Sequence, residues 1–161
     1  MRADAVLVEH HELLRDLLRR MEATTTDEVE LREQLRDTFV VEISIHAQIE
    51  DEIFYPPVRH VSPLVPIAHA EHRQIDDQLS AVMRVDPAGE DFLVEVRMLT
   101  STVEHHASEE EREMFPQSHA LGDAALEELG ERLRARQEQL RRSRLTRARL
   151  RLKRETLKRL R

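Results

Sequence analysis

The sequence contains no cysteine and no tryptophan, and only three of its 161 residues are glycine. The absence of cysteine excludes disulfides, iron–sulfur clusters, thiolate zinc sites and cysteine nucleophiles. No apolar run in the sequence approaches the roughly 18–20 residues that a membrane span needs, and residues 1–4 lack the layout of a signal peptide. We therefore expect a cytoplasmic protein that does not enter a membrane.

Aromatic residues are also scarce, at 3% of the chain, whereas charged residues make up 35%. Leucine, alanine, glutamate and arginine are abundant, and these residues favour helices over strands. No segment shows the alternation of apolar and polar residues that indicates a strand. The composition therefore predicts an all-α protein.

The net charge of −7 conceals two regions of opposite charge. Residues 131–161 contain 14 lysines and arginines and three acidic residues, whereas residues 1–130 contain 11 basic and 29 acidic residues. We interpret residues 1–120 as an acidic helical body and residues 121–161 as a basic helical extension. Because the extension lacks aromatic residues for base stacking, packing on its own body or a homodimer contact is favoured over nucleic-acid binding.

Apolar periodicity and punctuation predict the helices. The first covers residues 4–23, and the second begins at a capping box formed by Asp27 and Glu30 and ends before Pro56. The third begins at residues 62–66 and ends near 84, the fourth covers 90–115, and further helix follows residue 123.

Several of the nine histidines belong to an internal duplication. Each half contains His-x-x-x-Glu followed by an aromatic-Pro pair, and a Glu-His pair precedes the motif on the previous helix. The first half contains Glu9-His10, His46, Glu50 and Tyr55-Pro56, and the second contains Glu71-His72, His106, Glu110 and Phe115-Pro116.

Residues four apart lie on one face of a helix, so the His and Glu of each motif point the same way. That face is the apolar one in both motifs, and the histidines of the Glu-His pairs also lie on apolar stripes. Six polar side chains are therefore predicted to converge inside a four-helix bundle: His10, His46, Glu50, His72, His106 and Glu110.

Burying polar groups without partners costs a few kcal/mol for each group, so this cluster needs something that satisfies all its members. Six donors exceed the four that zinc prefers. Imidazoles and carboxylates in this number suit two iron ions bridged by carboxylates, with positions left for solvent or a small ligand. The pattern therefore predicts a di-iron centre.

On these motifs the sequence resembles the hemerythrin-like family, also called the HHE cation-binding domain, over roughly residues 3–118. Its length, the His10-His11 pair and the 70–74 stretch are most similar to small actinobacterial members, mycobacterial ones included. The resemblance implies an up-down-up-down four-helix bundle in which the six residues bind iron. Glu50 and Glu110 would bridge the ions, together with an oxo or hydroxo group. The ferritin-like alternative uses Glu-x-x-His, a spacing that no histidine here has.

The third helix departs from the pattern of the oxygen carriers. Those proteins place a second histidine four residues from the first, whereas here Ala68 and Asp76 flank His72 at that distance. The resemblance to mycobacterial-type members implies catalase-like decomposition of hydrogen peroxide in oxidative or nitrosative defence. The alternative is a module that binds or senses O2, NO or iron without turnover.

Residues beside the six donors are expected to have other roles. Tyr55 is an aromatic plug at the bundle end or a phenol that reaches the metals, and His69 is a supporting residue that could relay protons. His11 and His105 are expected to be partly exposed because they point about 100° away from their neighbours. Glu71 is an acceptor behind a ligand histidine or a surface acid, and the surface position is slightly favoured.

Overall fold

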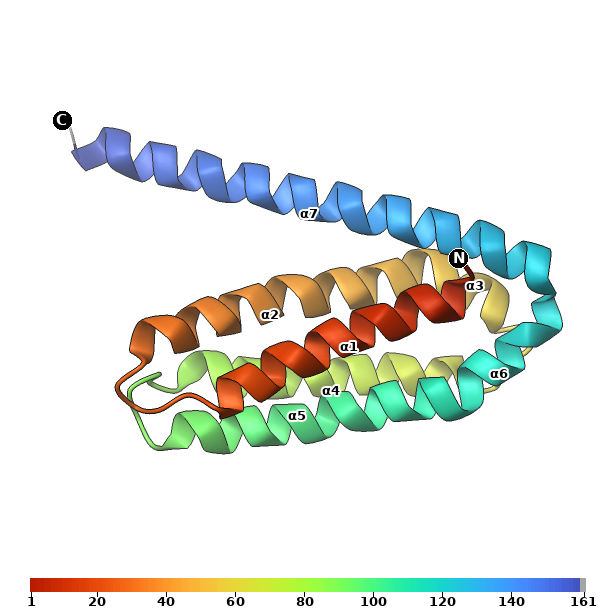
Figure 1. Cartoon of the computed structure of the whole chain (residues 1–161), viewed down its shortest axis with the longest axis horizontal. Helices are drawn as coiled ribbons and strands as arrows, with labels where there is room; N and C mark the ends of the chain where they lie inside the picture. Colours follow the sequence, from red (N-terminus) through yellow and green to blue (C-terminus); the bar gives the residue numbers. More distant parts are fainter. Residues whose placement is uncertain (160–161) are drawn as a thin grey trace.

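In the computed structural model, residues 1–159 are described, and within them the protein contains only helices and their connections. The bundle consists of four long antiparallel helices (Figure 1). They are α1 (Ala3–Glu22), α2 (Val29–Ile49), α4 (Val65–Arg84) and α5 (Asp91–Glu109). Their up-down-up-down order, together with the additional C-terminal helix described below, confirms the predicted fold class. Over the described residues, none of the helices has the length and apolar character needed to cross a membrane.

Both motif-bearing helices continue past the point where the prolines were predicted to end them. After α2 the chain forms a π-helical turn, η1 (Glu50–Phe54), and the short helix α3 (Tyr55–Val58). After α5 it forms η2 (Glu110–Met114), α6 (Phe115–Ser118) and the 3₁₀ turn η3 (His119–Leu121). Each proline lies in the first turn of a new helix, where its missing N–H is not needed. The prolines therefore mark a change of helix type.

The start of α2 also differs from the prediction. The helix begins at Val29, and no side chain caps it. Glu28 instead accepts a hydrogen bond from the backbone N–H of Thr25, which closes the preceding turn. The capping box predicted at Asp27 is therefore wrong.

The apolar core is divided in two by a layer of buried polar side chains. One cluster contains Leu7, Ile49 and Met114, and the other contains Leu14 and Val103, each with further members. Along α1, α2 and α5, buried histidines lie between members of the two clusters. The fold therefore holds the polar layer away from water on both sides.

The basic helix α7 (Asp123–Arg159) packs along α1 and α2 over its first half (Figure 1). Leu126 and Leu133 are fully buried there, and Gly130 lies so close to the carbonyl of Met1 that a Cβ would collide with it. Leu145 is exposed. Two leucines that the sequence places on the apolar side of this extension, Leu152 and Leu160, lie outside the described side chains.

Three arginines of α7 also form ion pairs with acidic residues of the bundle. The pairs are Arg134–Glu9, Arg136–Glu52 and Arg141–Glu42, with nitrogen–oxygen distances of 2.6, 2.8 and 2.8 Å. The opposite charges of body and extension therefore meet within the chain.

Candidate metal centre

Five buried side chains from three helices bring possible metal-binding atoms within 4.8 Å of one another. They are His11 of α1, His46 and Glu50 from α2 and its π turn, and His106 and Glu110 from α5 and its π turn. His72 of α4 adjoins this group, because its Nε2 lies 3.0 Å from Oε2 of Glu50. The duplicated motifs thus meet at the centre of the bundle, and all four long helices contribute.

The donor atoms of this cluster face a common space. Nε2 of His46 lies 3.1 Å from Nε2 of His11 and 3.1 Å from Oε1 of Glu50. Nε2 of His106 lies 3.7 Å from a carboxylate oxygen of Glu50 and equally far from one of Glu110. Imidazole nitrogens and carboxylate oxygens therefore converge without making a complete hydrogen-bond network.

Three buried atoms at the centre have no hydrogen-bond partner: Oε1 of Glu50, Nε2 of His106 and Oε2 of Glu110. Leaving such a group unsatisfied costs about 1–3 kcal/mol. A coordinated cation would satisfy all three at once, and their chemistry suits a metal that accepts nitrogen and oxygen donors. The residues present therefore fit a metal centre.

The histidine of α1 that enters the cluster is His11, not His10 as the sequence predicted. His11 is 1% exposed, so the expectation of partial exposure is wrong. His10 lies on the side of His46 that faces away from the cluster. The Nδ1 atoms of the two rings are 3.3 Å apart, and Nε2 of His10 is 2.8 Å from Glu42.

The structural correspondence of the two halves explains this difference. Oε1 of Glu71 lies 3.3 Å from Nδ1 of His106. In the same way, His10 contacts Nδ1 of His46. His11 therefore corresponds to His72, and His10 corresponds to Glu71. The sequence alignment of the two Glu-His pairs is offset from this correspondence by one residue.

Two acidic residues contact the imidazoles from the side away from the cluster, and only Glu42 was not considered as a site residue from the sequence. The surface position favoured for Glu71 is wrong, because Glu71 is 5% exposed, contacts His106, and has its second oxygen 3.1 Å from Nε2 of His105. Glu42 contacts His10 and is held from the other side by Arg141 of α7. Its position four residues before His46 was an available signal, because that spacing places both side chains on one helix face.

The π turns explain how Tyr55 reaches the cluster. In an α-helix, residues five apart point about 140° away from each other. Here the backbone N–H of Tyr55 bonds to the carbonyl of Glu50, five residues earlier, which brings the two side chains onto one face. The hydroxyl of Tyr55 lies 2.6 Å from Glu110, 3.0 Å from Glu50 and 3.2 Å from His72. Such turns are frequent at functional sites.

His69 lies at the edge of the site. Its Nδ1 is 3.2 Å from Asp51, and its ring centroid is 5.2 Å from that of Tyr55. Its side chain is 44% exposed. His69 therefore lies between Tyr55 and solvent, outside the central group of donors.

Burial and neighbouring charges shift the pKa values of the cluster in different directions. Burial lowers the pKa of His46 to about 3 despite the carboxylate of Glu50. For His72, hydrogen bonds to Asp51 and Glu50 outweigh burial and raise the pKa to about 9. Burial and the negative charge of Glu50 raise the pKa of Glu110. His46 is therefore neutral at pH 7, which is the form of histidine that binds metals.

Burial also raises the pKa of the Tyr55 phenol well above 10, and the two nearby carboxylates act in the same direction. Tyr55 therefore stays protonated and acts as a hydrogen-bond donor. Because one hydroxyl carries one proton, the bond at 2.6 Å to Glu110 is the one it makes.

A helical bundle with buried histidine and glutamate donors at its centre defines a class of cation-binding proteins. The family model for the hemerythrin HHE cation binding domain matches residues 2–118. The chain belongs to this family.

The chain is similar over most of its length to mycobacterial proteins. It is 37% identical over 143 residues to proteins of Mycobacterium tuberculosis and Mycobacterium bovis described as uncharacterized, and the match covers 88% of each chain. It is also 39% identical to a hemerythrin HHE cation binding domain-containing protein from Mycobacterium kansasii. That crystal structure superposes with a TM-score of 0.84, covering 92% of this chain and 93% of the other. The predicted resemblance to mycobacterial members of the family is confirmed.

Proposed function

We propose that the central cluster holds two iron ions and that the protein decomposes hydrogen peroxide there. The ligands in this proposal are His11, His46, Glu50, His72, His106 and Glu110, with His11 in the place first assigned to His10. The observation that carries the proposal is the group of three buried donor atoms without hydrogen bonds. Six donors are more than a single zinc ion uses, and imidazoles and carboxylates in this number would suit a pair of iron ions.

Burial of the cluster limits the size of its substrate. Five of the six side chains are at most 1% exposed, whereas that of His72 is 10% exposed. The His72 edge is the least buried side of the cluster, so a molecule as small as peroxide would approach there, where Tyr55 and His69 also lie. A larger organic substrate would have to displace the apolar core.

Peroxide decomposition converts two H2O2 into two H2O and one O2, so one peroxide gains two electrons and two protons that the other loses. Bound iron would supply the Lewis acidity and the electron exchange. The protein's part is to hold and pass the protons. The Tyr55 hydroxyl is placed to donate a proton at the carboxylate edge, and His69 is placed to exchange protons with solvent.

Iron content and oxygen evolution test the proposal together. Purified protein should contain two irons per chain, and oxygen release from peroxide should increase in proportion to bound iron. His46→Ala and Glu110→Ala should both lower the iron content. Oxygen evolution no greater than that of the same amount of free iron would contradict the catalytic proposal. A spectrum that changes reversibly with O2 or NO, without peroxide consumption, would instead support a binding or sensing role.

A further inference from the structure

Arg141, on the basic helix α7, is connected to the central cluster by an unbroken line of polar contacts. Its Nη2 lies 2.8 Å from Oε2 of Glu42, and its Nε lies 3.0 Å from Oε1. Oε2 of Glu42 lies 2.8 Å from Nε2 of His10, and Nδ1 of His10 lies 3.3 Å from Nδ1 of His46. The line runs from α7 through α2 and α1 to a histidine whose other nitrogen faces the cluster.

The burial of the side chains increases along this line toward the cluster. The side chain of Arg141 is 36% exposed, that of Glu42 is 11% exposed, and that of His10 is fully buried. A buried ion pair adds little net stability compared with apolar residues of similar size, because desolvation offsets its attraction. Holding α7 in place does not therefore explain why a carboxylate is brought so far into the core.

The position of the proton on each imidazole determines which atoms donate and which accept hydrogen bonds along this line. For Nε2 of His46 to offer an electron pair to a metal, the proton of His46 must be on Nδ1. That N–H then donates to Nδ1 of His10, whose own proton is on Nε2 and is donated to Glu42. Glu42 accepts from both His10 and Arg141. The carboxylate therefore selects the tautomers of both histidines.

We propose that Arg141, Glu42 and His10 are positioning residues that make the docked α7 helix part of the metal centre. They hold His46 in the tautomer and orientation that bind metal through Nε2, and the charge of Glu42 makes that imidazole a better donor. This inference rests on the proposed function in one respect, the assignment of His46 as a ligand.

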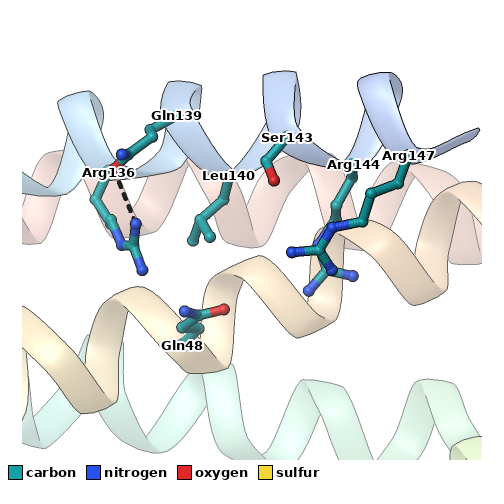
Figure 2. A pocket seen from close by; sticks show the side chains of 7 residues that line it. All are labelled: Gln48, Arg136, Gln139, Leu140, Ser143, Arg144 and Arg147. Carbon is teal, nitrogen blue, oxygen red and sulfur yellow. Dashed lines mark hydrogen bonds between the residues drawn. The ribbon is translucent and has the colours of Figure 1, made fainter. Parts of the chain in front are cut away.

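The same helix provides a matched control. Arg136 makes a two-point contact with Glu52, with distances of 2.8 and 3.2 Å, much like that of Arg141 with Glu42. Glu52 then accepts a bond from Gln48 instead of from a histidine. Figure 2 shows Arg136 on α7 and Gln48 on α2, at the groove between the two helices. Arg136→Gln thus removes an equivalent contact between α7 and the α2–η1 segment. This contact is not connected to the central cluster.

The test compares iron affinity, by competition with a chelator, and the optical spectrum of the iron-loaded protein in three variants. Glu42→Gln should weaken iron binding by up to the roughly 10–100-fold that is usual for removing a direct partner of a ligand histidine, because Glu42 acts on His46 through His10. Arg141→Gln should weaken it in the same direction and shift the spectrum, whereas Arg136→Gln should match the wild type. Arg141→Lys, which keeps a positive charge beside Glu42, should recover part of the lost affinity.

The possible failures can be told apart. If Arg141→Gln and Glu42→Gln both match Arg136→Gln in affinity and spectrum, the positioning role is wrong and the proposed function stands. If His46→Ala keeps its full iron content, the ligand assignment is wrong and the inference is overturned with it. Circular dichroism checks the folding of Glu42→Gln. If that variant does not fold, the comparison of Arg141→Gln with Arg136→Gln tests the positioning role instead. Both arginines are at least 30% exposed, so neither substitution should prevent folding.

Discussion

The two halves of the bundle offer the same donors to the cluster but support them differently. Behind His106, the carboxylate of Glu71 lies in direct contact at 3.3 Å. Behind His46 stands an imidazole, His10, and the carboxylate of Glu42 lies one residue further away. A carboxylate in contact with a ligand histidine raises its basicity more than a neutral ring does. The duplication therefore conserves the arrangement of donors while giving the two halves of the proposed di-iron centre different chemical surroundings.

The aromatic residues that follow the π turns differ as well. Tyr55 places a hydroxyl among the carboxylates, whereas Phe115 packs its ring parallel to that of His11, with 5.9 Å between the centroids. One half thus contributes a proton donor, and the other contributes only apolar surface. We infer that the proposed peroxide decomposition would take place on the Tyr55 side of the centre.

The largest effect is expected at Glu50, because it is shared by both halves. Its carboxylate lies within 3.1 Å of His46 and His72 and 3.7 Å from His106. Glu50→Ala should reduce bound iron to near zero, as measured by elemental analysis. Glu52→Ala, a variant of an exposed residue in the same turn, should keep its iron. An iron content in Glu50→Ala equal to that of the wild type would show that the halves do not share this ligand.

The correspondence between His11 and His72 predicts unequal effects for the adjacent histidines of α1. His11→Ala removes a donor and should lose about half of the iron or more, since it deletes a ligand outright. His10→Ala removes only a supporting residue and should keep iron with roughly 10–100-fold weaker affinity. Elemental analysis and chelator competition distinguish the two. The opposite order would restore His10 as the ligand and reject the correspondence.

Tyr55→Phe would make the two halves alike at this position. Iron content should be retained, because the Glu110 carboxylate that accepts this bond keeps its contacts with His11 and His106. Peroxide turnover should fall by roughly 10²-fold or more, the usual contribution of a positioned proton donor. Oxygen evolution per bound iron measures this loss. Unchanged turnover would show that Tyr55 serves only to fill the end of the bundle.

The smallest expected effect concerns the acid stability of the Glu42 contacts. Burial alone would raise the pKa of Glu42, but hydrogen bonds from His10 and Arg141 lower it to about 2. Because the pKa in the folded protein lies below its ordinary value of 4.5, the contacts stabilise the protein above pH 4.5, and this stabilisation is lost as the pH falls toward 2.

Metal-free protein allows this effect to be measured without iron. The Tm of the wild type should exceed that of Glu42→Gln by a few degrees at neutral pH, and the difference should shrink between pH 4.5 and 2. A difference that persists at the acid end would assign the effect to packing instead of charge.

The spacing of the motifs was sufficient to place much of the cluster. His46 with Glu50 and His106 with Glu110 lie together because residues four apart share a helix face in any α-helix. The fold class and the family follow from the same duplicated pattern, and both are confirmed. These features depend on local geometry, which the order of residues determines.

The choice between His10 and His11 depends on the rotation of α1 about its axis. Neighbouring residues of a helix point 100° apart, and both histidines belong to a broad buried face that packs against α2, α5 and α7. The periodicity of the sequence therefore admits either residue, and the packing of the other helices selects His11.

The amino-acid sequence by itself determined the helical bundle, the paired motifs and the opposite charges of body and extension, because each depends on residue type and spacing along the chain. Only the tertiary structure decided which histidine of α1 enters the centre, that π turns direct Tyr55 inward, and that Arg141 supports Glu42 from 99 residues away. The physical reason is that helix rotation, the choice of hydrogen-bond partner and contacts between distant segments are settled by packing among all the helices.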